Sequence, residues 1–148
     1  KTLDEVPNVS GVSNSPSAQA STAPDTVPPA AITDLAAYPG VEIGDVLLSW
    51  TAPGDDVRTG TAVTYTLRIS TTEITASNWV SATLVTGVPA PSLAGTRELF
   101  KLSNKPIKQT YYFAIKARDE VPNVASLSNV VNTVAESKRK LYLPITLR

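Results

Sequence analysis

Apolar and polar residues alternate with a period of two in short segments between Ile32 and Val134, and Gly, Pro, Asn and Asp residues separate these segments. Alternation of this kind places one side of a strand against a core and the other side in solvent. Turn-forming residues between the segments mark where strands end. The pattern therefore predicts strands at residues 32–37, 46–51, 64–70, 82–86, 97–102, 111–118 and 127–134.

A single short segment, residues 75–80, is predicted to form a helical turn. The hydroxyl of Thr72 or Thr75 suits the first position of such a turn, because it accepts a hydrogen bond from a free backbone N–H. β-Branched and turn-forming neighbours disfavour a longer helix. Seven short strands separated by turns are typical of a two-sheet sandwich, so the sequence predicts an all-β fold.

Four segments support a more specific prediction: PPAAITDL (28–35), VLLSWTAP (46–53), YTLRIS (65–70) and YYFAIKARD (111–119). In this order they resemble a fibronectin type III domain, of the version found in secreted bacterial multidomain proteins. The resemblance covers about residues 28–134. It implies a seven-stranded, immunoglobulin-like sandwich at residues 30–135, and strand-like segments remain at both termini beyond it.

The resemblance also implies which residues form the core. It makes Trp50 the core tryptophan of the second strand, and Tyr111 the tyrosine whose hydroxyl ties down the corner before the sixth strand. Between Leu102 and Tyr111 the chain is longer than the usual corner of the family. The predicted structural core, none of it a binding site, is Trp50, Tyr65, Leu67, Tyr111, Phe113 and Ile115.

A partial repeat organises the rest of the chain. KTLDEVPNVSGVSN at residues 1–14 returns as KARDEVPNVASLSN at 116–129, with nine of the fourteen positions identical. Repetition at a fixed offset is typical of tandem modules, so we expect a tandem array, with Lys1 arising from processing or truncation of a longer precursor. The predicted organisation is a remnant of a preceding repeat (1–15), a Ser/Thr/Pro/Ala linker (16–29), the domain (30–135), and a basic hinge with an apolar strand (136–148).

The two terminal segments are strand-like but lie outside the predicted sandwich. In the C-terminal segment four alternating apolar residues form one face, which exposure to water disfavours. A sheet edge in the same chain or in a neighbour would pair with it. We therefore predict an assembly interface, with either a second copy of this chain or a neighbouring domain of the precursor as partner. Its residues are Val6, Val9, Val12, Leu141, Leu143, Ile145 and Leu147.

Composition removes most catalytic functions. The chain has no His, Cys or Met, so the usual general base, thiol nucleophile and soft-metal ligands are absent. We expect neither an enzyme nor a cofactor. The 13 basic and 13 acidic residues cancel, which disfavours a nucleic-acid partner, and no apolar run is long enough to span a membrane. The linker composition favours an extracellular or cell-surface location.

Two parts of the sequence are candidate ligand sites. Asp55 and Asp56 are weak candidates for a calcium ion, since adjacent acids in a turn are usually only solvated and calcium needs six to eight oxygens. Trp79 is either a platform for a glycan ring or a packing residue. The leading prediction is a non-enzymatic extracellular structural module, assembled into a filament by donation of terminal strands. The alternative is a glycan- or protein-binding accessory or spacer domain of a secreted hydrolase or adhesin.

Overall fold

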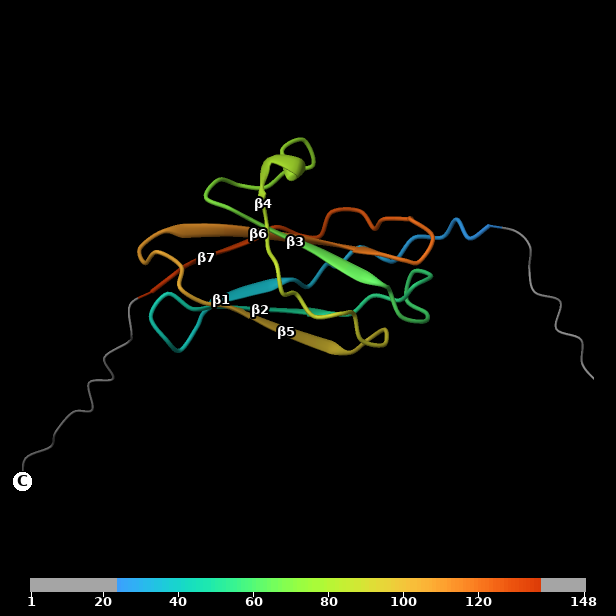
Figure 1. Cartoon of the computed structure of the whole chain (residues 1–148), viewed down its shortest axis with the longest axis horizontal. Helices are drawn as coiled ribbons and strands as arrows, with labels where there is room; N and C mark the ends of the chain where they lie inside the picture. Colours follow the sequence, from blue (N-terminus) through green and yellow to red (C-terminus); the bar gives the residue numbers. More distant parts are fainter. Residues whose placement is uncertain (1–23, 137–148) are drawn as a thin grey trace, which may run out of the picture.

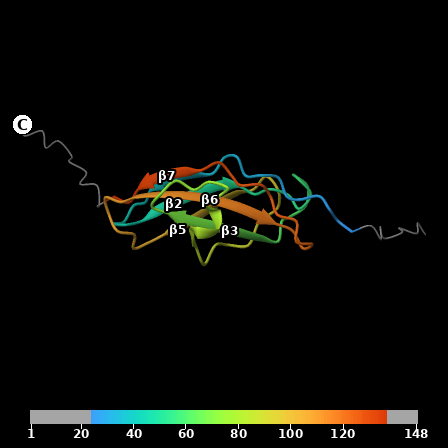
Figure 2. The same ribbon diagram turned by 90° about the horizontal axis from the view of Figure 1, so that it is seen from above.

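A computed structural model describes residues 24–136, which form two antiparallel β-sheets packed face to face (Figure 1). The three-stranded sheet has the order β1-β2-β5, and the four-stranded sheet has the order β4-β3-β6-β7. The strands are β1 (Ala36–Pro39), β2 (Val46–Thr51), β3 (Thr64–Ser70), β4 (Thr83–Leu84), β5 (Arg97–Leu102), β6 (Thr110–Arg118) and β7 (Val131–Val134). The predicted seven-stranded sandwich is therefore confirmed. Figure 2 shows from above that the strands follow the long axis.

Strands β2, β3 and β5 begin and end at the predicted residues. The first and last strands begin later than predicted, because the side chain of Asn129 occupies the place of a strand partner. Its Oδ1 accepts a hydrogen bond from the Leu35 N–H at 3.0 Å, and its Nδ2 donates one to the Leu35 carbonyl at 2.9 Å. Beside it, Ser128 Oγ accepts a hydrogen bond from the Ile115 N–H. Regular pairing starts only beyond these residues.

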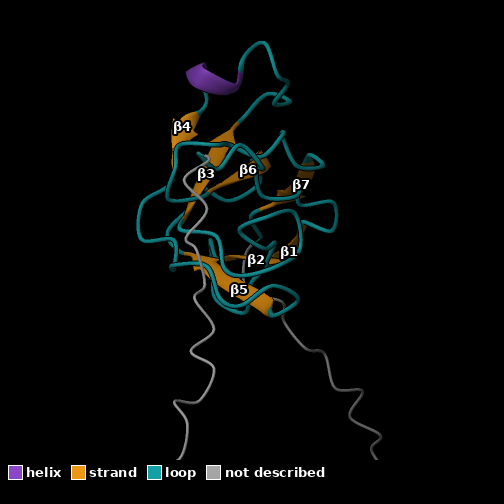
Figure 3. Ribbon diagram, turned by 90° about the vertical axis from the view of Figure 1, so that its right-hand side faces the viewer, coloured by secondary structure: helices purple, strands orange, loops and turns teal. Residues whose placement is uncertain are grey.

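The helical turn also falls later than predicted. It is the 3-10 turn η1 (Trp79–Ser81). Before it, Asn78 Oδ1 accepts a hydrogen bond from the Thr75 N–H at 2.7 Å, and the Asn78 N–H donates a long one to Thr75 Oγ1 at 3.4 Å. These side-chain bonds hold residues 75–78 as a turn. Figure 3 shows η1 standing on the outside of the four-stranded sheet.

Apolar residues from both sheets fill the interior. Trp50 has none of its surface exposed, and its ring meets the ring of Tyr65 edge to face at 5.3 Å. Leu67, Phe113 and Ile115 are fully buried, Tyr111 is buried, and Tyr65 is half-buried. The main core cluster consists of Ile32, Leu35, Val46, Leu48, Trp50, Leu67, Ile69, Leu102, Tyr111, Phe113, Ile115 and Ala135.

The corner between β5 and β6 is closed by a tyrosine. The Tyr111 hydroxyl donates a hydrogen bond to the Pro106 carbonyl at 3.3 Å. Asn104 and Lys108 adopt positive φ values of 59° and 63°, which let this long connection turn tightly enough for the hydroxyl to reach.

The described chain enters and leaves the sandwich at opposite ends (Figure 1). At one end, which we call the N-terminal pole, the Asp25 carbonyl accepts a hydrogen bond from Asn123 Nδ2. The loops at residues 53–60, 93–95 and 119–124 lie at this pole. At the other end, the C-terminal pole, the Gly44 N–H donates a hydrogen bond to the Glu136 carbonyl at 3.1 Å. The loops at residues 40–45 and 103–109 lie there.

Candidate functional site

The acidic loop at the N-terminal pole is held by its own backbone. The Asp55 N–H donates to the Thr59 carbonyl at 2.7 Å, and the Thr59 N–H donates back to the Asp56 carbonyl at 2.9 Å. Desolvation and the adjacent Glu120 carboxyl, with smaller contributions from Asp119 and Asp56, raise the pKa of Asp55 above its ordinary value. Among residues 24–136 no group of three or more His, Cys, Asp or Glu side chains is arranged to hold a metal ion. This loop therefore concentrates negative charge without forming a coordination sphere.

The neighbouring Asp119 supports the turn that follows β6. Its side chain is fully buried, and its two oxygens accept hydrogen bonds from the Asn123 N–H and Nδ2, both at 2.9 Å. Because Asn123 also bonds the Asp25 carbonyl, the turn holds the chain where it enters the domain. A carboxylate used in this way is a structural group, and Glu120 beside it is exposed.

Trp79 lies against the outer face of the four-stranded sheet. Only 8% of its surface is exposed, and it forms a small cluster with Ile74, Ala82 and Ala114. The Arg68 guanidinium carbon and the Lys116 Nζ each lie 5.2 Å from the ring centre, a distance at which cations are attracted to an aromatic face. This arrangement leaves little of the indole for a sugar ring to stack on.

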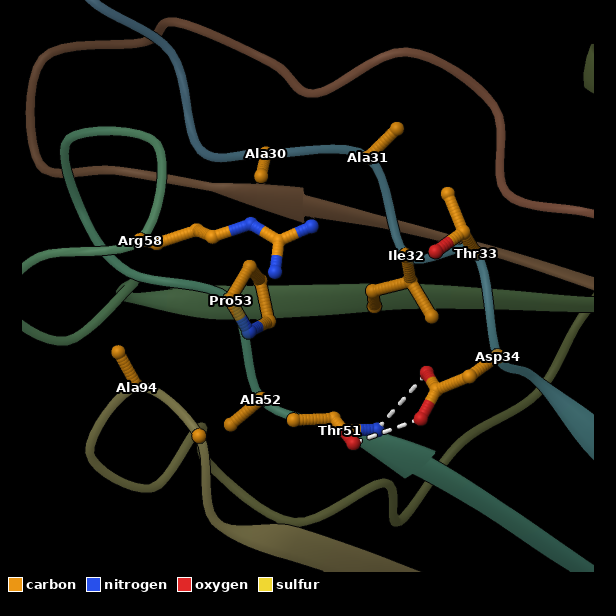
Figure 4. A pocket seen from close by; sticks show the side chains of 11 residues that line it. Ala30, Ala31, Ile32, Thr33, Asp34, Thr51, Ala52, Pro53, Arg58 and Ala94 are labelled. Carbon is orange, nitrogen blue, oxygen red and sulfur yellow. Dashed lines mark hydrogen bonds between the residues drawn. The ribbon is translucent and has the colours of Figure 1, made fainter.

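A pocket of about 390 Å³ opens at the N-terminal pole (Figure 4). It lies between residues 30–34, the end of β2 and the turn before β5. Asp34 accepts hydrogen bonds from the Thr51 N–H at 3.0 Å and from its hydroxyl at 2.6 Å. Arg97 lies 3.9 Å from the same carboxylate. In Figure 4 the Arg58 guanidinium lies between Ala30 and Pro53.

The electrostatics of this pocket do not favour catalysis. Partial burial disfavours the charged form of Asp34, but the Thr51 hydrogen bonds and the Arg97 charge outweigh it, so the pKa of Asp34 lies below its ordinary value. A lowered pKa makes this carboxylate a weaker base toward the Thr51 hydroxyl than an ordinary aspartate would be. Half of the remaining lining is alanine, so the pocket offers a shaped surface with the cationic Arg58 at its edge.

The predicted assembly residues lie outside the described residues 24–136, so their interface stays a prediction. They are Val6, Val9, Val12, Leu141, Leu143, Ile145 and Leu147.

Several side chains of these sites carry no signal in the sequence. Arg68 and Lys116 stand at outward-facing positions of predicted strands, which indicates only exposure. Their contact with Trp79 depends on how the chain folds after β3. Arg58 and Asp34 are brought together across a pocket from two separate segments, and neither belongs to a recognisable motif. It is the pairing of β3 with β6 that places Arg68 and Lys116 on one face of the sheet.

Two solved structures define the class of domain. The fibronectin type III domain from the human KIAA0970 protein superposes with a TM-score of 0.52 at 14% identity, over 79% of this chain and 82% of that one. The sixth fibronectin type III domain of human fibronectin type III domain containing protein 3 gives 0.51 at 17% identity, over 79% and 94%. The chain has a fibronectin type III fold. The predicted fold class is confirmed, whereas the bacterial version and the preceding repeat stay predictions.

Similarity in sequence leads to a different group of proteins. Human calcium-activated chloride channel regulator 1 is 36% identical over 116 residues, which are 72% of this chain and 12% of that protein. Human calcium-activated chloride channel regulator 2 is 34% identical over 137 residues, 82% of this chain and 14% of that protein. The chain therefore spans about an eighth of the length of the curated relatives it matches. No family model matches the chain.

Proposed function

We propose that this chain is a non-enzymatic, extracellular structural module that spaces and joins its neighbours. The observation that carries the proposal is that the described residues 24–136 enter and leave the sandwich at opposite poles. A module of this geometry adds length when modules follow one another. The relatives support a modular role, because the matched region is a small part of much longer proteins. No helix in residues 24–136 is long and apolar enough to span a membrane.

The joining function belongs to the terminal segments. Both carry apolar residues beyond a domain that already has its seven strands, with Leu141, Leu143, Ile145 and Leu147 alternating at the C-terminal end and Val6, Val9 and Val12 at the N-terminal end. A strand donated by one copy to the next makes a heterologous contact, which generates an open filament when the geometry does not close. The partner is then a second copy of the chain, or a neighbouring domain of a longer precursor. The Ser/Thr/Pro/Ala linker at residues 16–29 supports the extracellular location.

Sedimentation velocity and electron microscopy of the chain of residues 1–148 test this function. We expect species of high molecular mass at micromolar concentration. Deleting residues 1–20, or residues 141–148, should leave a folded monomer. Polymers that persist after both deletions would contradict strand donation, and a monomer at every concentration would contradict the filament.

The accessory-domain alternative is favoured by one observation, the open pocket beside Arg58. A guanidinium at the edge of a pocket suits a carboxylate of a protein or an acidic sugar. Calorimetric titration with a soluble acidic polysaccharide, compared between the unmodified chain and Arg58→Ala, measures this binding. Equal binding by the two proteins would show that Arg58 does not hold a ligand.

A further inference from the structure

In the described part of the chain β5 forms an edge of the three-stranded sheet, with a neighbouring strand on one side only. It pairs with β2 alone. The Ala52 N–H donates to the Thr96 carbonyl at 2.8 Å, and opposed residues of an antiparallel pair alternate between bonded and non-bonded. The backbone groups of Leu99 and Lys101 therefore point away from β2. No described backbone group bonds them, so they are available to an added strand.

A groove runs beside this edge. Figure 3 shows β4 and β5 on the same side of the sandwich, away from β1 and β7. Between them is a cavity of about 290 Å³, lined by Leu84 and Val85 on one side and Phe100 and Leu102 on the other. A second cavity of about 330 Å³ shares Ile69, Thr83 and Lys105 with the first and continues it. An extended peptide that pairs with β5 can place every second side chain against Leu84, Val85, Phe100 and Leu102. The lining between these apolar residues also includes the polar residues Thr83, Thr86 and Lys105.

We infer that this edge and groove accept residues 141–147 of a second copy of the chain, an inference that rests on the proposed function. Leu141, Leu143, Ile145 and Leu147 alternate, so in an added strand they face the groove together. Pro144 lies between them and has no N–H to donate. In that strand its backbone faces outward, away from β5, where the missing donor leaves no hydrogen bond unmade.

The positions of basic and acidic residues indicate that the donated strand comes from a second copy rather than from the same chain. The residues before it, Lys138–Arg139–Lys140, are basic. The acids Asp55, Asp56 and Glu120 gather at the N-terminal pole, where they outnumber Arg58 of the same loop. Lys140 follows Glu136 by four residues, a reach of at most about 14 Å. The nine residues of β6, which run between the poles, span roughly 30 Å. The basic run therefore does not reach the acidic pole of its own domain, whereas that of a second copy does.

The same charges indicate whether the donated strand runs parallel or antiparallel to β5. The Ala94 N–H donates a hydrogen bond to the Gly60 carbonyl at 3.1 Å, which joins the acidic loop to the turn that leads into β5. A basic run seated on these acids places Leu141 near the start of β5 and Leu147 near its end. The donated strand is then parallel to β5, and the two copies associate head to tail.

Disulfide trapping tests the contact without background, because the chain has no cysteine. Ser103 follows β5, is exposed, and continues the outward-facing positions of Leu99 and Lys101. In the parallel arrangement Thr146 of the second copy lies beside it and Tyr142 lies at the far end. The pair Ser103→Cys with Thr146→Cys should give a ladder of disulfide-linked multimers on a non-reducing gel. The matched control, Ser103→Cys with Tyr142→Cys, should give at least about tenfold less.

Three results would overturn the inference. A disulfide that forms only within one chain would show that the segment docks on its own domain. A control pair that crosslinks as well as the test pair would contradict the parallel direction. Polymers of the test variant that form without any disulfide would place the donated strand elsewhere. That last result leaves the proposed function intact, whereas an unmodified chain that stays monomeric would refute both.

A variant of the edge gives a second readout. Leu99→Pro removes an outward N–H that the described domain does not use, and should reduce assembly at least about tenfold. Leu99→Thr keeps the N–H and should assemble as the unmodified chain does. Circular dichroism and tryptophan fluorescence verify that both variants are folded. If Leu99→Pro is unfolded, the disulfide experiment alone tests the inference. If Leu99→Pro is folded and assembles normally, the inference is overturned.

Discussion

At the scale of single residues, the centre of the molecule depends on two aromatic rings. Trp50 is completely buried and meets Tyr65 edge to face, an arrangement that aromatic quadrupoles favour. Burial, with the charge of Glu98 and against the effect of the nearby Trp50 indole, raises the pKa of Tyr65 to about 12. Tyr65 is therefore neutral at physiological pH and acts as a packing residue.

Replacing Trp50 with Ala should destabilise the domain by about 3 to 5 kcal/mol, because it removes the largest fully buried side chain and leaves a cavity. Urea denaturation followed by circular dichroism measures the loss. The control is Leu99→Ala, whose side chain is 63% exposed and should cost less than about 0.5 kcal/mol. Similar midpoints for the two variants would contradict the central role of Trp50.

Asp55 is a residue whose charge works against the fold. Its pKa is raised above the ordinary 3.8, so the native state holds that proton more tightly than the unfolded chain does. The stability linked to this group is complete below pH 3.8 and is lost as pH rises through the raised pKa. Asp55→Asn should therefore raise the melting temperature at neutral pH and have little effect at about pH 3.

A double variant tests whether Glu120 causes part of the pKa shift of Asp55. Because desolvation and Glu120 are the leading causes of the shift at Asp55, adding Glu120→Gln to Asp55→Asn should bring less than the sum of the two single gains. Full additivity would mean that the two carboxyls do not interact. A melting temperature that falls at neutral pH in Asp55→Asn would contradict the direction of the shift.

At the scale of the elements, a single side chain replaces part of two strands. Asn129 bonds both the N–H and the carbonyl of Leu35, and so joins the segment before β1 to the segment before β7. Leu35 is buried, so both of its backbone groups need partners inside the protein. This clamp fixes the first segment against the sandwich where no regular ladder does.

Asn129→Ala should cost about 1 kcal/mol or more, since it leaves two backbone groups of a buried residue unpaired. Hydrogen exchange should show faster exchange of the Leu35 amide, and chemical denaturation measures the loss. The matched control is Asn132→Ala, an exposed asparagine within β7, for which we expect almost no change. Unchanged protection of the Leu35 amide in Asn129→Ala would contradict the clamp.

Asn129 also shows which strand boundaries could be predicted from the sequence and which could not. Strands β2, β3 and β5 could be predicted to the residue because alternation and flanking turns are local signals. The starts of β1 and β7 could not, because Leu35 and Asn129 are 94 positions apart and no local pattern joins them. Trp79 left two interpretations open for the same reason: the cations that flank it come from β3 and β6.

At the scale of the whole molecule, surfaces that the sequence could not predict arise from where the sheets end. The three-stranded sheet stops at β5 and the four-stranded sheet stops at β4, so an edge and a groove remain beside each other. The net charge of zero gives no indication that Asp55, Asp56 and Glu120 lie together at the N-terminal pole. Alternation predicts a strand at residues 141–147, which lie outside the described part of the chain, and it gives no indication of which surface would pair with that strand.

The acidic pole leads to a prediction about assembly. If basic residues of one copy sit on the acids of the next, salt should weaken polymer formation, because exposed charges are screened within about 10 Å at 0.1 M salt. The double variant Asp56→Lys with Glu120→Lys should raise the concentration needed for assembly at least about tenfold and should flatten its dependence on salt. Sedimentation velocity between about 0.05 and 0.5 M salt measures both effects.

Glu73→Lys supplies the control, since it makes the same kind of charge change at an exposed residue outside this pole. A polymer held by local charge pairs should tolerate Glu73→Lys and not the double variant. Equal weakening by both variants would show that net charge, rather than the acidic pole, governs association. Because Asp56 and Glu120 are exposed, neither variant should unfold the domain, so a loss of assembly would report on the contact itself.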